Sequence, residues 1–338
     1  MINGMINGAE CNEATTDTHL SPTARKMGHP YAGVQTVAGR HLSENIHRWL
    51  IGVLSKFVPS ASSMRILLLW TACLLSTQTA VLAQTAPEEL RKAARNPFAN
   101  VIKLSFDEDF TFNQGPYDRN ANSLAIEPVI PLSITGEWLL VTRVVATALA
   151  YQPNEAKSGG TTGTADTTVS FFLSPAHTGK LIWGVGPAIL MPTATSNQLG
   201  AGKWGVGPTG ALLVEPEWGS AGVLVQNIWS VAGGSNRSPV NQMQLEPMFS
   251  YNLPRGWYLT SSPTIISDWT QPSSKRWLVP IGSGVGRSFK IGKQAVDSNL
   301  TLYWSAVRPE NLFSPKWQLC LEFTFLFPIT KHSRTPNH

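Results

Sequence analysis

The end of the chain alternates between apolar and polar or small side chains. Leucine and phenylalanine occupy every second position from Leu319 to Phe327, and polar or small residues lie between them from Gln318 to Thr324. A period of two indicates a β-strand with one apolar face and one mixed face. In a membrane β-barrel the apolar face meets lipid, the mixed face meets the lumen, and the last strand typically finishes on an aromatic residue. The pattern therefore predicts a transmembrane barrel.

The start of the mature protein is marked by a secretory signal peptide over residues 64–83. Met64 and Arg65 form a short basic region, an apolar segment follows, and Ala83 ends a small-residue cleavage site before Gln84. Residues 1–63 precede this signal and lack sustained periodicity. Two interpretations stay open for them: an over-long start with Met64 as the initiator, or a genuine long leader.

Charge and cysteine content restrict the partners of the mature chain. Its net charge is only +3 and no run of lysine or arginine occurs, so nucleic acid is not expected as a partner. Cys320 is the only cysteine after the cleavage site, so no intrachain disulfide can form. No run of 18 apolar residues occurs there, which excludes transmembrane helices from the prediction.

Alternating segments of about ten residues or more recur along the mature chain, as membrane barrels require. The twelve predicted strands are residues 101–112, 123–134, 138–151, 167–173, 181–191, 203–214, 222–231, 241–253, 257–269, 276–288, 296–307 and 316–327. Short turns and longer Gly-, Ser-, Asn- and Pro-rich loops alternate between them. The predicted fold class is all-β, an antiparallel transmembrane β-barrel of about 12 strands over residues 99–328. A periplasmic N-terminal segment (84–98) precedes it, and a C-terminal tail (329–338) follows it.

Strand parity places charged side chains on the polar faces, where a wet or paired lumen tolerates them better than a dry core. The candidate lumen-lining residues are Lys103, Asp107, Asp109, Glu127, Arg143, Glu246, Asp268, Asp297 and Glu322. They either set which solutes pass or pair across the lumen and merely fill it. Tryptophans near strand ends match an interfacial aromatic girdle: Trp138, Trp183, Trp204, Trp218, Trp257, Trp269, Trp277 and Trp317.

Prolines interrupt several predicted strands, although proline cannot donate to a hydrogen-bond ladder. They are Pro128, Pro131, Pro187, Pro208, Pro247, Pro263 and Pro280, and two of them end the repeated sequence WGVGP on consecutive strands. One interpretation is that they mark bulges or kinks that bend strands around a small barrel. The other is that some of these segments are not transmembrane strands.

A set of short motifs resembles one family of bacterial outer-membrane proteins. The motifs are NP at 96–97, GPYDR at 115–119, PVIP at 128–131, FLSPA at 172–176, KLIWGVGP at 180–187, LMPTAT at 190–195, VNQM at 240–243, YNLP at 251–254, GWYL at 256–259, IGKQ at 291–294 and FLFP at 325–328. In order and spacing they resemble proteins related to the meta-pathway phenol-degradation protein, many of which are labelled neuromedin U. The chain departs from that family in the charged run 107–109 and in the tail. The resemblance implies a barrel and, by family label, a transporter or channel without established catalytic residues.

No arrangement of residues predicts catalysis. The mature histidines are His177, in a predicted turn, and His332 and His338, in the tail, so none is expected beside a serine and an acid in a lumen. Neither zinc-type spacing nor a Walker sequence occurs, and no cofactor or metal is predicted. The protein is therefore not expected to be an enzyme.

The leading hypothesis is a passive channel or transporter for small solutes, hydrophobic or aromatic ones included, in the outer membrane of a Gram-negative bacterium. Its expected partners are outer-membrane lipid, the barrel-assembly machinery through the C-terminal strand, and an unknown small solute. An even strand number puts both termini on the periplasmic side. The alternatives are a structural or adhesive barrel without transport and a secreted β-sandwich or lectin whose apolar faces meet each other.

Overall fold

The computed structural model describes residues 87–154, 156–177, 179–309 and 314–329. The signal peptide predicted at 64–83, the preceding residues 1–63, and all of the tail except Ile329 lie outside the described residues. No helix in the described part of the chain is long and apolar enough to cross a membrane.

Nearly all of the described chain is β-strand. One helix, α3 (Pro87–Arg95), comes first. The strands are β1 (Val101–Gln114), β2 (Arg119–Ser133), β3 (Trp138–Pro153), β4 (Gly160–Gly163), β5 (Thr167–Pro175), β6 (Leu181–Met191), β7 (Lys203–Val214), β8 (Gly219–Gly233), β9 (Asn241–Asn252), β10 (Trp257–Ser261), β11 (Ile265–Asp268), β12 (Trp277–Ile291), β13 (Gln294–Val307) and β14 (Trp317–Pro328). Three single turns of 3-10 helix are η1 (Gly115–Tyr117), η2 (Pro254–Gly256) and η3 (Ser273–Lys275).

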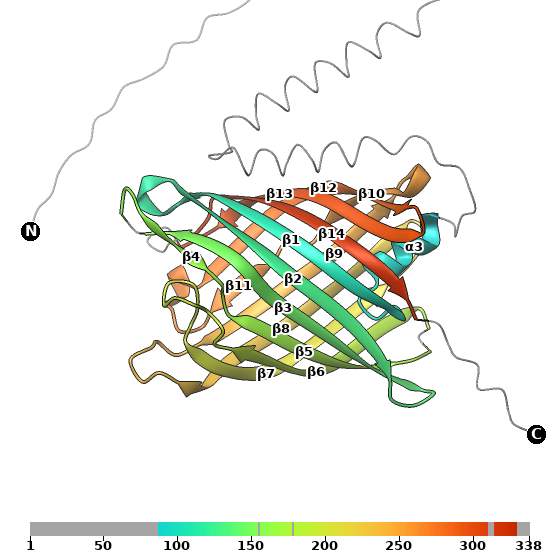
Figure 1. Ribbon diagram of the computed structural model, residues 1–338, viewed down its shortest axis with the longest axis horizontal. Coiled ribbons are helices and arrows are strands. Elements are labelled where there is room, and N and C mark those ends of the chain that lie inside the picture. The colour runs from blue at the N-terminus through green and yellow to red at the C-terminus, as the bar shows by residue number, and fades with distance from the viewer. Residues whose placement is uncertain (1–86, 155, 178, 310–313, 330–338) are drawn as a thin grey trace, which may run out of the picture. The chain divides into compact units, whose positions relative to one another are not determined.

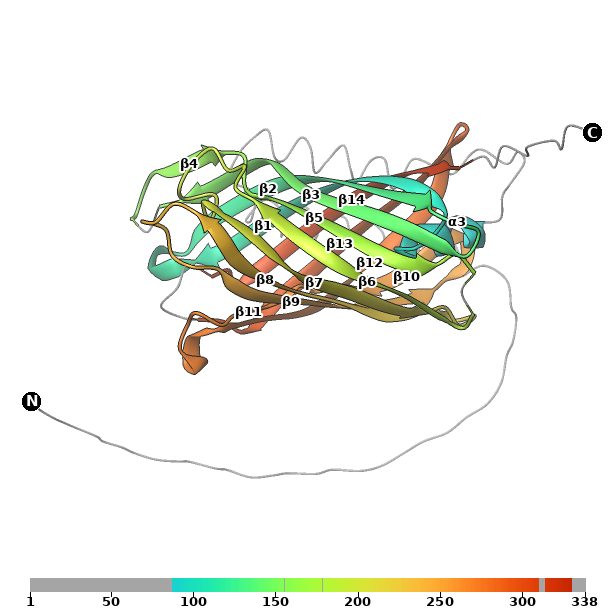
Figure 2. The same ribbon diagram turned by 90° about the horizontal axis from the view of Figure 1, so that it is seen from below.

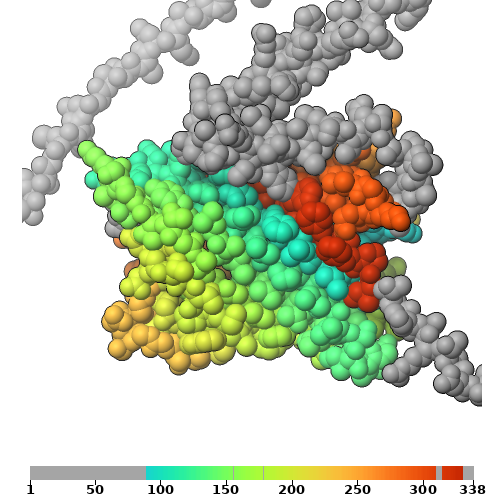
Figure 3. All heavy atoms as spheres, in the orientation of Figure 1, coloured from blue at the N-terminus to red at the C-terminus, as the bar shows by residue number. Residues whose placement is uncertain are grey.

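The sheet closes on itself because its first and last strands pair. β1 and β14 are antiparallel from Val101 opposite Pro328 to Phe112 opposite Trp317. The C-terminal strand, drawn in red, lies directly against the cyan first strand (Figure 3). β10 and β11 both pair with β9 and β12, so they are two parts of one wall strand, and β4 only extends β3. The wall is thus a closed antiparallel barrel of 12 strands (Figure 1), which confirms the predicted fold class.

Two ends of the barrel differ in their connections. Residues 134–137, 176–177 with 179–180, 215–218, 253–256 and 292–293 belong to short connections at one end, called here the short-turn end. The other end, called the long-loop end, carries most of the longer connections, including the one between β3 and β5, described over 154 and 156–166, and 192–202. Gly292 has a φ of 62° and begins a two-residue hairpin turn, where glycine avoids the strain that other residues would meet. Figure 2 shows α3 at the end opposite β4 and β11.

The outside of the barrel is apolar. On β13, Leu302 and Trp304 are exposed by 47% and 44%, whereas Thr301 and Tyr303 between them are buried. Such a surface suits lipid, because soluble proteins seldom expose so many large apolar side chains together. Tryptophans lie at or beside strand ends at both rims: Trp138, Trp183, Trp218 and Trp257 at the short-turn end, and Trp204, Trp269, Trp277 and Trp317 at the long-loop end. The outer face therefore has the two aromatic belts of a membrane-spanning wall.

Most of the prolines coincide with interruptions of a ladder, whereas Pro131 pairs with Val141 in an unbroken register, and every segment that contains a proline remains part of the wall. The predicted strand 257–269 is broken around Pro263, and β10 and β11 are the two parts. The register between β12 and β13 shifts between Val279 and Pro280, as expected of a bulge. On β7 the pairing with β8 skips from Val206 to Thr209, which leaves Pro208 unpaired on that side.

Candidate functional site in the barrel lumen

A cavity of about 510 Å³ occupies the lumen. At one end it reaches Ala94 and Arg95 of α3, near the short-turn end. At the other it reaches Leu278 and Gln318, the second residues of β12 and β14 at the long-loop end. The cavity therefore runs along most of the barrel and stops at the helix.

Seven of the nine candidate lumen residues line this cavity: Lys103, Asp107, Asp109, Glu127, Arg143, Glu246 and Glu322. The other two lie elsewhere. Asp268 is the last residue of β11, at the long-loop end. Its Oδ1 accepts hydrogen bonds from the backbone N of Thr270 at 3.0 Å and from the Oγ1 of Thr270 at 2.6 Å. Asp297 is fully buried beneath the helix. The alternation along each strand thus predicts that these charged side chains share the inner face of the barrel. The structure shows that they lie at different levels along the lumen.

Some of the lining charges are paired. Nη2 of Arg143 donates to Oε2 of Glu127 at 2.9 Å across β3 and β2. Nδ2 of Asn299 donates to Oε2 of Glu322 at 2.5 Å. Within the described residues, no hydrogen bond or ion pair joins the carboxylates of Asp107 and Glu246 to another group. The charges that line the cavity are therefore only partly paired with one another.

The helix α3 closes the short-turn end of the lumen. Its alanines favour a helix, and its basic residues Lys92 and Arg95 lie in the last turn, where they complement the helix dipole. Nη1 of Arg91 donates to the carbonyl oxygens of Leu253 at 3.2 Å and Trp257 at 3.3 Å, on either side of the β9–β10 turn. The helix is thus fixed to the rim of the wall.

Lys103 of β1 binds the last carbonyls of the helix. Its Nζ donates to the oxygens of Ala94 at 2.8 Å and Asn96 at 2.6 Å, and the side chain is buried. A lysine at a helix C-terminus satisfies carbonyls that have no partner within the helix and favours the dipole. This contact joins α3 to the first wall strand.

Arg95 inserts into a buried network formed by β10, β12 and β13. Its Nη2 donates to Oδ2 of Asp297 at 2.5 Å and to the Tyr258 hydroxyl at 2.6 Å, and that hydroxyl donates to the same Asp297 oxygen at 2.6 Å. The Ser288 hydroxyl donates to the other oxygen of Asp297. Burial alone would lower the pKa of Arg95, but Tyr258, Asp297 and Glu322 raise it well above its usual value. Arg95 is therefore charged at any physiological pH.

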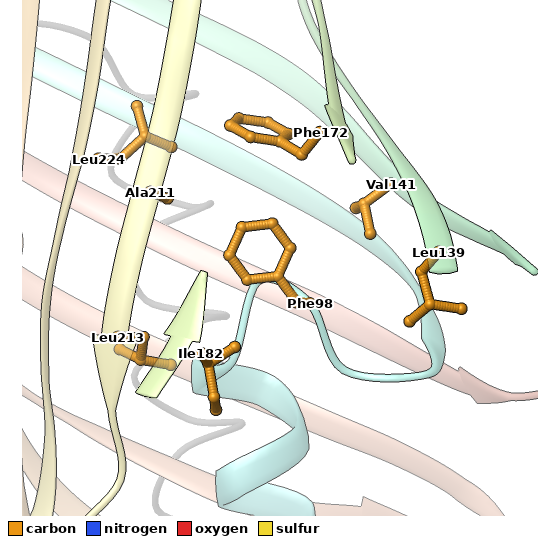
Figure 4. Packing of buried hydrophobic residues seen from close by; sticks show 8 residues of the cluster. All are labelled: Phe98, Leu139, Val141, Phe172, Ile182, Ala211, Leu213 and Leu224. Carbon is orange, nitrogen blue, oxygen red and sulfur yellow. The ribbon is translucent and has the colours of Figure 1, made fainter. Parts of the chain in front are cut away.

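Phe98, just after the helix, completes the closure with apolar contacts. It packs among Leu139 and Val141 of β3, Phe172 of β5, Ile182 of β6, Ala211 and Leu213 of β7, and Leu224 of β8 (Figure 4). Its ring meets that of Phe172 edge to face at 5.7 Å. We call α3 together with residues 96–98 the plug.

Gly184 of β6, in the first WGVGP sequence, makes room for the plug. A Cβ at this position would lie 2.5 Å from Cε1 of Phe98. Gly286 of β12 is similar, because a Cβ there would overlap the ring of Tyr258. The sequence alone does not predict this role for either glycine.

Substituting Gly184 by valine should displace Phe98, because overpacking at this site costs about 1–3 kcal/mol and the plug is easier to move than the wall. We expect trypsin to cut the folded variant after Arg91, Lys92 or Arg95 several times faster than the wild type. The control is Gly210→Val on β7, where a Cβ meets only ordinary contacts at 3.5 Å and beyond. Equal cleavage rates for all three proteins would contradict this role of Gly184.

The fold and the plugged lumen define a transmembrane β-barrel of the outer-membrane type. No family model and no curated protein matches the sequence. Among solved structures, the chain is similar to an outer membrane channel from Pseudomonas putida F1, with 16% identity and a TM-score of 0.51 over 67% of this chain and 95% of that one. This likeness shows the shared fold.

Weaker likenesses are to two further outer-membrane proteins. One is outer membrane phospholipase A from Escherichia coli, with 11% identity and a TM-score of 0.35 over 72% of this chain and 98% of that one. The other is the toluene transporter TodX from Pseudomonas putida, with 7% identity and a TM-score of 0.36 over 70% and 93%.

Proposed function

We propose that this protein is an outer-membrane channel for the passive entry of small solutes, including hydrophobic or aromatic ones. The observation that carries the proposal is the cavity of about 510 Å³ that runs along the lumen from the long-loop end to the plug. Small barrels without transport have their interiors filled by side chains, whereas this lumen keeps solute-sized space. The resemblance to the phenol-degradation family and the fold of the Pseudomonas putida channel support the same function.

The composition of the cavity supports an apolar component of the solute. Phe98, Phe172, Leu224 and Met248 line the cavity beside its polar residues. Ligand pockets commonly combine such apolar walls with a few polar groups that orient the ligand. A wholly polar lumen would suit sugars or ions better.

The plug supports the proposed orientation. α3, the start of β1 and the end of β14 all lie at the short-turn end. Outer-membrane barrels have short turns on the periplasmic side, so both ends of the barrel segment and the plug would face the periplasm. A solute would enter at the long-loop end and leave past α3.

A structural or adhesive barrel is the second candidate. Hydrogen bonds that fix the conformation of the loops at the long-loop end favour it. Arg237 donates to the carbonyl oxygens of Asn197 at 2.9 Å and Ala201 at 3.0 Å, and Asp166 accepts from the backbone N of Ala194 and Ala201. These contacts hold three loops together as a fixed outer surface. Such a surface could bind a partner without any transport.

Catalysis is not part of the proposal. His177 lies in the short turn between β5 and β6, away from the residues that line the cavity, and the other two histidines of the mature chain lie outside the described residues. A serine, a histidine and an acid are therefore not brought together among the cavity-lining residues.

The test is solute entry into cells that make the protein. We expect N-phenyl-1-naphthylamine, a small aromatic dye, to enter several times faster than in cells with an empty vector, because the barrel adds a path across the outer membrane. A variant lacking the 154–166 loop should keep this entry and lose any surface attachment if that loop is adhesive. Dye entry equal to the empty-vector rate, in cells whose barrel is inserted, would favour the structural candidate.

A further inference from the structure

The lumen carries more negative than positive charge. Its lining includes the carboxylates of Asp107, Asp109, Glu127, Glu246 and Glu322, against the cations of Arg95, Lys103 and Arg143. Each cation already has partners: Arg143 binds Glu127, Arg95 binds Asp297 and lies 3.7 Å from Glu322, and Lys103 binds two carbonyls of the plug. Within the described residues, Asp107, Asp109 and Glu246 thus have no cation bound to them.

Two of these carboxylates lie side by side on one strand, and the third lies across the barrel from them. Asp107 and Asp109 are on β1, and Glu246 is on β9, which lies on the far side of the closed wall in the strand order. All three line the same cavity. A carboxylate inside a protein is costly unless a cation or several donors compensate it, so this space is suited to a positively charged guest.

An apolar surface adjoins the carboxylate of Glu246. Leu224 of β8 is directly opposite Glu246 in the sheet, and Met248 follows two residues later on the same face of β9. Phe98 and Phe172 line the same cavity. A solute whose charged group binds Glu246 would therefore have its uncharged part in contact with Leu224, Met248 and Phe98.

From this arrangement we infer that the preferred solutes are small organic amines, with a cationic ammonium group and an aromatic or aliphatic body. The carboxylates of Asp107, Asp109 and Glu246, which have no protein cation bound to them, bind the ammonium, and the apolar residues beside Glu246 bind the body. Acidic rings in channels favour cations in the same way. The inference rests on the proposed function and specifies the substrate class of the same lumen.

The binding test compares three probes with one carbon skeleton and different charge: 2-phenylethylammonium, 2-phenylethanol and phenylacetate. We expect only the first to raise the thermal unfolding temperature of the detergent-solubilised mature protein at millimolar concentration. Glu246→Gln and Asp107→Asn should each reduce this shift by at least half, whereas Asp268→Asn, at the long-loop end, should leave it unchanged. Equal shifts with the ammonium and the alcohol, or a larger shift with phenylacetate, would overturn the inference.

A second measurement separates this inference from the proposed function. In planar bilayers under a KCl gradient, the reversal potential of the barrel gives the permeability ratio of K⁺ to Cl⁻. We expect a ratio of several-fold in favour of K⁺, reduced towards one in a Glu246→Gln, Asp107→Asn double variant. Conductance with a ratio of one or below in the wild type would leave the channel standing and overturn the cation preference. Absence of any conductance or dye entry would instead count against the channel itself, while the probe-binding result still decides the ligand class.

Discussion

Removal of residues 87–98 should raise the single-channel conductance of the refolded barrel by about tenfold, because these residues close the short-turn end of the lumen. Four sets of contacts disappear together: those of Arg91 with the β9–β10 turn, those of Arg95 with Asp297 and Tyr258, those of Lys103 with the last carbonyls of the plug, and the packing of Phe98. None of the wall strands loses its ladder. The measurement is planar-bilayer recording of the mature chain and of the deletion variant at the same salt concentration.

The matched control removes a similar length from the other end. Deleting residues 330–338 leaves the plug and every described strand in place, so the conductance should stay at the wild-type level. Heat-modifiable migration in electrophoresis would verify that each protein has folded as a barrel. A folded deletion variant with wild-type conductance would show that the plug does not limit the flow of ions.

Replacing Asp297 by alanine should destabilise the protein by about 3 kcal/mol, because it leaves the buried guanidinium of Arg95 without its nearest counter-charge and with only Glu322 at 3.7 Å. The hydroxyls of Tyr258 and Ser288 lose their acceptor in the same step. We expect a lower unfolding temperature and, since the plug loses its strongest contact, more frequent channel openings. Thermal unfolding followed by circular dichroism measures the first effect, and bilayer recording measures the second.

Two further variants make this result specific. Asp268→Ala removes an aspartate that only caps an exposed loop, so its effect should be within about 0.5 kcal/mol of zero. The double variant Arg95→Met, Asp297→Leu removes both charges and should recover much of the stability that Asp297→Ala loses, since replacing a whole buried pair costs far less than breaking it. Equal destabilisation by the single and the double variant would contradict the role given to this pair.

The wall of the barrel could be predicted from the sequence because each strand carries its own signal. Lipid on one side and a polar lumen on the other impose alternation, and parity then gives the direction of every side chain. Residues 181–191 and 203–214 were predicted with the bounds of β6 and β7. The break at Pro263 was not placed, because a proline can be accommodated by a bulge or by an interruption and the sequence does not distinguish them.

The plug could not be predicted in the same way. α3 has only nine residues, which is too short for a reliable helical period, and nothing local to it shows that it enters a barrel. Its main partner, Asp297, is 202 positions away along the chain. Parity placed Asp297 on the lumen side but could not show that Arg95 reaches it. One usable signal was present in Gly184, since a glycine on an inward face marks space that another part of the chain must occupy.

The pairing of β1 with β14 also constrains the order of events during assembly. The first and last strands of the barrel can pair only after the strands between them have formed. Closure of the barrel therefore joins residues far apart in the sequence and should be slow. Only residues 96–100 separate α3 from β1. The helix must therefore reach its position as the barrel closes. The lumen of the newly assembled protein is then already closed by the plug.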